Sequence, residues 1–505
     1  MTAVTPTSDS ASRYRIEPTV MQALRSPRLL TREVLAGLVV ALALIPEAIA
    51  FSIIAGVDPR VGLFSSFIMA VAIAFLGGRP AMITAATGAI ALVIAPVARE
   101  HGMDYFIATV LLGGLIQIVL ALLGVAKLMR FIPRSVMVGF VNALAILIFT
   151  SQFPQLIGVP WLVYPLVAVG LLVMYLMPLI TKVIPAPLVA IVLLTAAVVV
   201  FAWNVPNVGD QGELPQSLPE LFIPNVPLTF ETLQTIAPFA LAMAVVGLLE
   251  SLMTAKLVDD ITDTHSRKTR EALGQGAANV LSGAFGGMGG CAMIGQTMIN
   301  VKASGARTRI STFLAGVFLL VLVLALGDVV AIIPMAALVA VMILVSIATF
   351  DWHSIRWGTL KRMPKSETAV MLITVIATVW THNLAVGVIL GVITAMIMFA
   401  RRVAHFVSVT RTIDDDASTA RYAVNGELFF ASSNDLTTQF EYADDPDTVV
   451  IDMSRSHVWD ASTVAALDAI VTKYERHGKS VTIEGLNDTA AAFHDRLTGN
   501  LGNGH

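Results

Sequence analysis

The chain has 505 residues, of which 56% are hydrophobic and 13% are charged, and its mean hydropathy is +0.79. This composition excludes a soluble globular protein and indicates a polytopic membrane protein, because apolar stretches long enough to span hydrocarbon recur from residue 35 to residue 400. The single cysteine, Cys291, excludes an internal disulfide, and the nine histidines show no metal-ligand spacing.

The charged residues are divided unevenly along the chain. The net charge is −3, yet residues 411–505 hold 16 acidic and 7 basic residues, a net −9 that leaves +6 on the rest. This division predicts two bodies with different solvents. We assign residues 1–34 to a polar cytoplasmic segment without a cleavable signal peptide, residues 35–404 to a transmembrane transport domain, and residues 405–505 to a cytoplasmic domain.

Apolar runs between turn signals predict about fourteen membrane spans. The spans lie at residues 35–55, 60–77, 85–98, 104–129, 136–153, 161–180, 185–204, 235–256, 273–284, 289–301, 308–327, 329–350, 366–381 and 383–402. With a cytoplasmic N-terminus, the clusters of Lys and Arg all fall in loops on one side, as the positive-inside rule requires. Arg60 and Arg99 are exceptions on the other side, where the long loop 205–233 has no Lys or Arg. The even count places both termini in the cytoplasm, beneath the inner (plasma) membrane.

Two of these spans are interrupted, at matching places in the two halves of the chain. RPAMITAATGAIALVIAP (79–96) and GGMGGCAMIGQTMINV (286–301) both begin as extended stretches rich in small residues and only then become able to form a helix. Half-helices that start inside the membrane are typical of the binding site of a secondary transporter, because their unpaired N–H groups and positive dipole ends point at the ligand. The alternative is that Gly and Ala only allow close helix packing.

The predicted helix starts supply the candidate anion-binding groups. Small residues let backbone N–H groups approach an anion, and the side-chain amide of Gln296 is a further donor. Neither start carries Lys or Arg, so an anion with several charges would need protons to accompany it. The candidate binding residues are Thr87, Gly88 and Ala89 in the first segment and Ile294, Gly295 and Gln296 in the second.

Two carboxylic acids, Glu47 and Glu250, lie inside apolar runs. A carboxylate at that depth costs roughly 3 kcal/mol to insert, so it normally faces a cavity and binds a proton or a cation. The alternative is a structural acid that is hydrogen-bonded between helices. Pro46 would disrupt the helix just before Glu47. Phe51 lies one turn after Glu47 on the same face, where it forms either a wall of the cavity or ordinary apolar packing.

The acidic C-terminal part changes to a pattern of short strands and helices. TARYAVNGELFFASS (419–433) alternates like a hairpin, and residues 448–454 read as a buried strand. Residues 461–478 read as an amphipathic helix and residues 479–486 as another strand. Strands and helices that alternate within fewer than 100 residues predict a small α/β domain.

Four motifs occur in order along the chain. They are LIPEAIAFSIIAGVDPRVGLFSSF (44–67), FIPRSVMVGFVNALAILIFTSQ (131–152), NVLSGAFGGMGGCAMIGQTMINVKASGARTR (279–309) and GELFFASSNDL (426–436). The first three resemble span motifs of the sulfate permease (SulP) family of anion transporters, and the fourth resembles the entry to that family's cytoplasmic STAS domain. The resemblance covers residues 31–486 and points to a bacterial member.

The resemblance implies an α-helical polytopic fold of 14 transmembrane segments in two inverted repeats of seven, arranged as core and gate domains, followed by the α/β STAS domain. The substrate would lie between the starts of the third and tenth half-helices. Carried over position by position, the site-facing residues are Glu47, Phe51, Thr87, Ala89, Ile294 and Gly295, with Glu250 and Thr254 from the eighth span. Family members carry sulfate, bicarbonate, chloride, oxalate or C4-dicarboxylates, commonly as homodimers.

Three positions depart from the family pattern. Gln296 stands where many members have Arg, so a fixed cationic ligand is absent. Glu47 stands where animal chloride exchangers tend to have Gln, which favours proton-coupled uptake over chloride traffic. Ala461 follows Asp460 where some STAS domains present a phosphorylatable serine, so a phosphorylation switch is not expected at that position; Ser462 is adjacent.

Together these features predict a proton-coupled symporter of a small inorganic or organic anion, working by alternating access. No cofactor or metal is expected, and the coupling ion is H⁺ rather than Na⁺, carried by Glu47, Glu250 and Thr254. Besides lipid, the expected partners are a second copy of the chain and a cytoplasmic protein at the STAS domain, and not nucleic acid. The alternatives are an uncoupled anion channel or exchanger, a nucleobase symporter of the same fold, and a STAS-based sensor. An enzyme is not expected, because no nucleophile–base spacing occurs.

Overall fold

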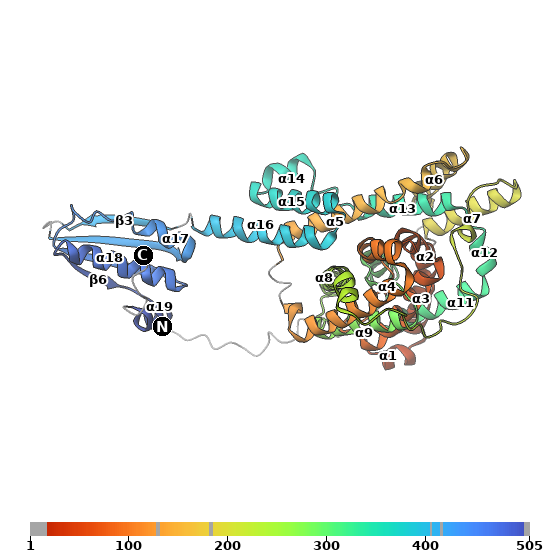
Figure 1. Cartoon of the computed structure of the whole chain (residues 1–505), viewed down its shortest axis with the longest axis horizontal. Coiled ribbons are helices and arrows are strands. Elements are labelled where there is room, and N and C mark those ends of the chain that lie inside the picture. Colours follow the sequence, from red (N-terminus) through yellow and green to blue (C-terminus); the bar gives the residue numbers. More distant parts are fainter. Residues whose placement is uncertain (1–17, 128–131, 181–184, 405–406, 415–417, 499–505) are drawn as a thin grey trace. The chain divides into compact units, whose positions relative to one another are not determined.

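The computed structural model describes residues 18–127, 132–180, 185–404, 407–414 and 418–498 (Figure 1). The chain divides into two units, residues 1–392 and 393–505. The dividing point lies inside helix α16 (Leu384–Ala404), so the boundary expected at residue 404 stays a prediction.

A helical segment lies at the position of each predicted span. The elements of the first half are α1 (Val20–Arg25), α2 (Pro27–Ala55), α3 (Pro59–Leu76), α4 (Gly88–Leu122), α5 (Arg134–Thr150), the 3₁₀ turn η3 (Phe153–Leu156), α6 (Val163–Ile180) and α7 (Ala186–Val200), and all but α1 and η3 lie at predicted spans. Helix α2 begins before the predicted residue 35. Helix α4 covers two predicted spans, 85–98 and 104–129. The two parts are separated by a kink at Gly102, whose φ of 82° is not helical.

The second half of the chain is also helical. Its elements are η4 (Val208–Gln211), α8 (Phe230–Thr262), α9 (Lys268–Ala284), α10 (Ile294–Met298), the π-helical turn η5 (Ile299–Ala303), α11 (Arg309–Ala325), α12 (Gly327–Ala331), α13 (Met335–Thr349), α14 (Trp357–Arg362), α15 (Lys365–Thr381) and α16. By length and apolar composition alone, 7 helices of the described chain could cross a membrane. The number of fourteen spans therefore stays a prediction.

The membrane unit contains two sets of packed helices. Helices α2, α3, α4, α8, α9 and α11 pack on one another, and α5, α6, α7, α13 and α15 form the second set. Figure 1 shows α5, α6 and α13 apart from the group that contains α3, α4 and α9. This division is the one expected for core and gate domains, and it assigns both broken segments to the core.

The C-terminal unit is built on a four-stranded sheet in the order β3-β4-β5-β6. Its elements are β3 (Ser408–Ile413), β4 (Thr419–Leu428), α17 (Phe430–Leu436), β5 (Thr448–Val458), α18 (Ala461–Arg476), β6 (Ser480–Glu484) and α19 (Asp488–Leu497). The hairpin predicted within 419–433 is wrong: 419–428 form one strand, whose antiparallel partner is β3. The alternating pattern marked a half-buried strand and could not identify the strand that pairs with it.

A buried carboxylate joins the elements of this unit. Asp445 accepts hydrogen bonds from the hydroxyls of Tyr422 at 2.7 Å and Tyr474 at 2.5 Å, and it pairs with Arg411 at 2.7 Å. Burial and the Asp445 charge raise the pKa of Tyr474, and burial raises the pKa of Tyr442 to about 12. The folded unit therefore keeps phenol protons that an unfolded chain would release.

We expect the stability of this unit to be constant at neutral pH and to fall as the pH rises above about 10, the unperturbed tyrosine value. A group whose pKa is raised by folding stabilises the fold below its unfolded pKa, and this contribution is lost as the pH passes the folded value. Alkaline unfolding of the full chain, followed by circular dichroism and phenolate absorbance, measures the effect. Tyr474→Phe should lower stability at neutral pH and flatten its alkaline pH dependence; an unchanged alkaline profile would contradict this assignment.

Candidate functional site

The two broken segments meet in a short antiparallel ladder. Strand β1 (Thr84–Ala85) pairs with β2 (Cys291–Ala292), with Thr84 opposite Ala292 and Ala85 opposite Cys291. The approach is so close that a Cβ added at Gly290 would lie 1.9 Å from the carbonyl oxygen of Ala85, so only glycine fits. Because the strands are antiparallel, the chain leaves the ladder at opposite ends toward α4 and α10.

Both helices begin where the sequence places them. Helix α4 begins at Gly88, and Thr87 caps it by accepting a hydrogen bond from the N–H of Ile90 at 3.4 Å. Helix α10 begins at Ile294 and continues through the π-helical turn to Ala303, and it has no side-chain cap. The first start is buried, whereas Gly295 at the second is exposed. The two helix starts therefore differ in access to a ligand.

Glu250 is linked to the first helix start through the cysteine. The carboxylate of Glu250 accepts from the thiol of Cys291 at 2.9 Å, and Cys291 lies 3.1 Å from the hydroxyl of Thr87. Thr254, one turn after Glu250, donates to the carbonyl of Ala292 at 3.2 Å. The acid predicted for ion coupling thus contacts the ladder and, through Cys291, the cap of α4. Sequence reasoning used Cys291 only to exclude disulfides.

Glu47 is linked to the second helix start. The amide nitrogen of Gln296 donates to Glu47 at 2.8 Å. Gln296 is 2% exposed, and within the described part of the chain its amide oxygen is buried without a hydrogen-bond partner. The amide that was expected to bind the anion is therefore directed at the acid.

Phe51 packs against the first helix start. A Cβ added at Gly88 would lie 2.8 Å from the Phe51 ring and 3.2 Å from Ile148 of α5, so the three residues are in close contact. A Cβ added at Gly295 would meet no atom within 4 Å. Ala89 is buried on α4, and Ile294 is half-buried on α10. The contacts thus form three groups, Glu47 with Gln296, Phe51 with Gly88, and Glu250 with Thr87 through Cys291.

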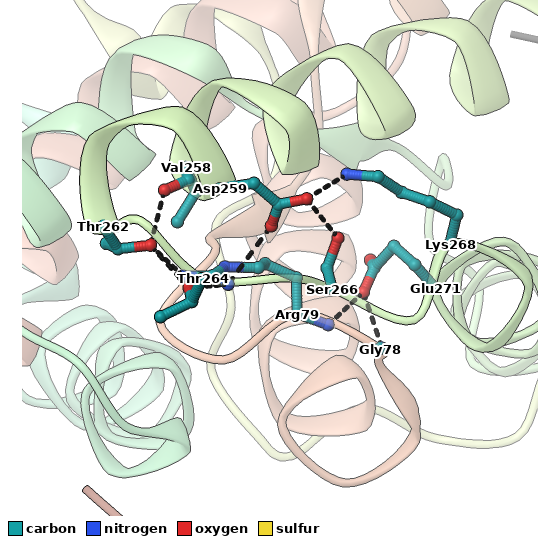
Figure 2. A network of polar contacts seen from close by, with 9 residues as sticks. All are labelled: Gly78, Arg79, Val258, Asp259, Thr262, Thr264, Ser266, Lys268 and Glu271. Atoms are coloured by element: carbon teal, nitrogen blue, oxygen red, sulfur yellow. Dashed lines mark hydrogen bonds and ion pairs between the residues drawn. The ribbon is translucent and has the colours of Figure 1, made fainter. Parts of the chain in front are cut away.

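A polar network fixes the turn that leads into β1. The guanidinium of Arg79, which is 3% exposed, donates to Asp259 at 3.2 Å and to Thr264 at 2.7 Å (Figure 2). Glu271 accepts from the backbone N–H groups of Gly78 and Arg79 at 2.7 and 2.9 Å. The turn at the start of the first broken segment is therefore tied to the C-terminal end of α8 and the N-terminal end of α9.

Helix α9 carries a buried polar face that holds both broken segments, and sequence reasoning missed it. Its members are spaced by four, four and three residues, and they are Glu271, Gln275, Asn279 and Ser282. Gln275 donates to Thr84 at 2.8 Å, and Asn279 exchanges two hydrogen bonds with Gly290. A polar stripe at helical spacing inside a predicted span was the signal that could have identified it.

We expect Asn279→Leu to destabilise the membrane unit and to abolish transport. The substitution leaves the N–H and C=O of Gly290 and the amide oxygen of Gln117 without their Asn279 partners, and each such buried group costs about 1–3 kcal/mol. Thermal unfolding in detergent and uptake into proteoliposomes measure the two effects. Leu281→Ala on the exposed face of α9 is the control and should change neither. Wild-type uptake by Asn279→Leu would contradict this role.

Glu33 is a further buried acid that sequence reasoning assigned to the polar N-terminal segment. It lies in α2 with 0% exposure, and its carboxylate accepts from the backbone N–H groups of Arg307, Thr308 and Ser311 at the start of α11. This is a carboxylate at a helix N-terminus, which stabilises the helix. Among the described residues, no group of three or more His, Cys, Asp or Glu could hold a metal ion.

Comparison with known families and sequences places the chain among anion transporters. The sulfate permease family matches residues 30–170 and 159–374, and the STAS domain matches residues 410–497. YbaR of Bacillus subtilis (strain 168), a protein named for sulfate transport, is 50% identical over 462 residues, which cover 92% of this chain and 96% of YbaR. The bicarbonate transporter BicA of Picosynechococcus sp. is 26% identical over 494 residues, covering 87% and 86% of the two chains.

Solved structures share the fold. The transmembrane domain of a cyanobacterial bicarbonate transporter BicA matches with a TM-score of 0.62 and 26% identity, over 73% of this chain and 98% of that one. The murine anion transporter Slc26a9, solved in the inward-facing state, matches with a TM-score of 0.80 and 17% identity over 96% and 88% of the two chains, a likeness of fold. These matches confirm the predicted helical membrane fold with a C-terminal STAS domain.

Proposed function

The chain belongs to the sulfate permease family and carries a STAS domain, and from that premise we propose that it moves a small anion together with protons across the membrane. It is a multi-pass anion transporter and not an enzyme. The substrate classes are C4-dicarboxylate, bicarbonate and sulfate. The relatives named for sulfate and bicarbonate make these two the first anions to test.

The anion site lies between the starts of α4 and α10. Backbone N–H groups at Gly88 and Ala89 and at Ile294 and Gly295 would supply the positive ends of two helix dipoles, together roughly one unit of charge. An exposed start at Gly295 supports this assignment, because a ligand can reach it without displacing a side chain. Phe51 would close the site on the side of Gly88.

The proposal of proton coupling rests on one observation. Among the described residues, the amide oxygen of Gln296, beside Glu47, has no hydrogen-bond partner. A charged Glu47 carboxylate accepts from the amide nitrogen and leaves that oxygen without a donor. A protonated Glu47 carries an O–H, so the acid and the amide can form a reciprocal pair in which both are satisfied. Binding a proton at Glu47 would thereby remove a negative charge from the site as the anion enters.

Alternating access follows from the two sets of helices. Glu47, Glu250 and both helix starts belong to the core set, whereas Ile148 belongs to the gate set. Movement of the core against the gate would break the contact of Phe51 and Gly88 with Ile148 and expose the site to the other side. The anion and the proton would move with the core.

Uptake into proteoliposomes with an imposed pH gradient tests the proposal. Accumulation of labelled sulfate, bicarbonate or fumarate should depend on an acidic exterior and collapse when an ionophore dissipates the gradient. An uncoupled channel would show no accumulation and no counterflow, and an exchanger would show counterflow without dependence on the pH gradient. Uptake that is independent of the gradient would overturn proton coupling.

We further infer that the protein acts in the inner (plasma) membrane as a homodimer, with the N-terminus and the STAS domain in the cytoplasm. The basic loops on one side and the acidic tail support this orientation. Protease accessibility in right-side-out vesicles and the mass of the detergent-solubilised protein test the orientation and the assembly.

A further inference from the structure

A cavity lies along the path toward the proposed anion site, on the side of the membrane unit opposite the basic loops. Its volume is about 500 Å³, and it is lined by α2, α4, the end of α5, and residues of α13 and α15. Among the lining residues, Ala50 of α2 and Leu92 of α4 are the nearest in sequence to Glu47 and Gly88. Glu47 and Gly88 lie one helical turn below them, so the cavity ends just above the contact between Phe51 and Gly88.

The cavity has an unbalanced positive charge. Arg99 lines it, and none of the described residues that line it is acidic. The Arg99 guanidinium donates to the carbonyl of Ile54 at 2.9 Å, and it forms no ion pair within the described part of the chain. Thr150 and Gln152 at the end of α5 add polar groups to the wall. We name this space the Arg99 cavity.

The second arginine on this side of the membrane unit, Arg60, differs from Arg99 because it forms ion pairs. Arg60 pairs with Glu213 at 2.5 Å and with Asp58 at 3.7 Å, so carboxylates compensate its charge. These two arginines were the exceptions to the positive-inside rule. Of these two arginines, Arg99 is the one that lines a cavity without a carboxylate partner among the described residues.

We propose that the Arg99 cavity is an anion-capture site, through which a small carboxylate or oxyanion enters from the external side before it reaches the helix starts. The proposal rests on the proposed anion transport. Arg99 lies eleven residues beyond Gly88 on α4, about 17 Å along the helix axis. A cavity lined by charge of one sign concentrates counter-ions and speeds their binding. Arg99 would thus supply a fixed positive charge on the entry path, whereas the helix starts themselves carry no Lys or Arg.

None of the described residues that line the cavity belongs to either helix start, so the cavity does not include the proposed anion site. Phe51, Gly88 and Ile148 are in contact at its inner end, so an anion held near Arg99 would reach the helix starts only when that contact opens. Capture and transport are therefore separate steps, and they change different kinetic constants. Loss of the Arg99 charge should weaken capture of external anion and leave the later steps intact.

Uptake of sulfate and bicarbonate into right-side-out vesicles tests this role. Arg99→Gln should raise KM for the external anion by about tenfold at low ionic strength with kcat unchanged, and the difference should shrink as an inert salt screens the charge. Arg99→Lys keeps the charge and should stay within about twofold of wild type. If Arg99 serves only to donate a hydrogen bond to Ile54, kcat will fall in both variants with KM unchanged, which would overturn the proposal.

Charge restoration in an Arg99→Cys variant gives an independent result. A membrane-impermeant thiol reagent that adds a positive charge from outside should restore a low KM, and one that adds a negative charge should raise KM further. Cys291, the other thiol, is 0% exposed and serves in the parent protein as the unreactive control. Equal effects of the two reagents would overturn the proposal. A wild-type protein that moves none of the anions would reject the proposed function itself.

Discussion

Glu47→Gln is expected to eliminate accumulation of the anion driven by a pH gradient. A gradient of about one pH unit is worth about 1.4 kcal/mol per proton, which supports roughly tenfold accumulation in an electroneutral cotransport with one proton. Glutamine keeps the shape of the side chain and an oxygen that accepts from Gln296, but it cannot bind a proton. Accumulation should therefore fall to equilibrium with the external solution.

The same variant should retain counterflow, because exchange of one anion for another does not require the proton to move. Labelled anion taken up by proteoliposomes preloaded with unlabelled anion measures this. Glu100→Gln on the exposed part of α4 is a matched control and should accumulate normally. If Glu47→Gln kept full accumulation, the coupled proton would have to be carried elsewhere, and Glu250→Gln would be the next variant to measure.

Gly88→Ala is expected to slow transport by about 5- to 150-fold, the rate change that corresponds to an overpacking cost of about 1–3 kcal/mol. The added methyl would lie 2.8 Å from the Phe51 ring and 3.2 Å from Ile148, in a contact between the core and gate sets of helices. If the core moves against the gate as proposed, this contact exists only while the site is closed on that side, and the cost then falls on one state of the transport cycle.

A double-mutant cycle separates this effect from general damage. Phe51→Ala removes the ring that the methyl would meet, so it should restore most of the rate lost in Gly88→Ala. Gly295→Ala is the matched control at the other helix start, where a Cβ meets nothing within 4 Å, and its effect should not depend on Phe51. Additive losses for Gly88→Ala and Phe51→Ala would show that the two side chains are not coupled.

The starts of the two half-helices could be predicted because they depend on neighbouring residues. Thr87 caps α4 and Gly88 follows it, and α10 begins at Ile294 after a run of small residues. Capping and backbone freedom act within about one turn, so the sequence carries the signal. The hairpin prediction for residues 419–433 was wrong for the opposite reason. The strand that pairs with residues 419–428 is β3, which lies outside the 419–433 motif.

The partners of the acids could not be predicted. Glu250 lies 41 positions before Cys291, and Glu47 lies 249 positions before Gln296. Helical periodicity shows which face of a helix a residue occupies, but not which distant element covers that face. The same limit hid the polar face of α9, whose Gln275 and Asn279 each contact a different broken segment.

The sequence by itself determined that this is a membrane transporter with a STAS domain and where the two half-helices begin. Hydropathy, helix capping and motif order depend on residues that are close together in the sequence, so they can be recognised without the structure. Only the tertiary structure decided which groups act together. It directed Gln296 to Glu47, joined Glu250 to Thr87 through Cys291, and placed Arg99 in a cavity whose described lining residues include no carboxylate. These pairings depend on how helices from both halves of the chain pack, since the energy of a buried polar group is set by its neighbours in space.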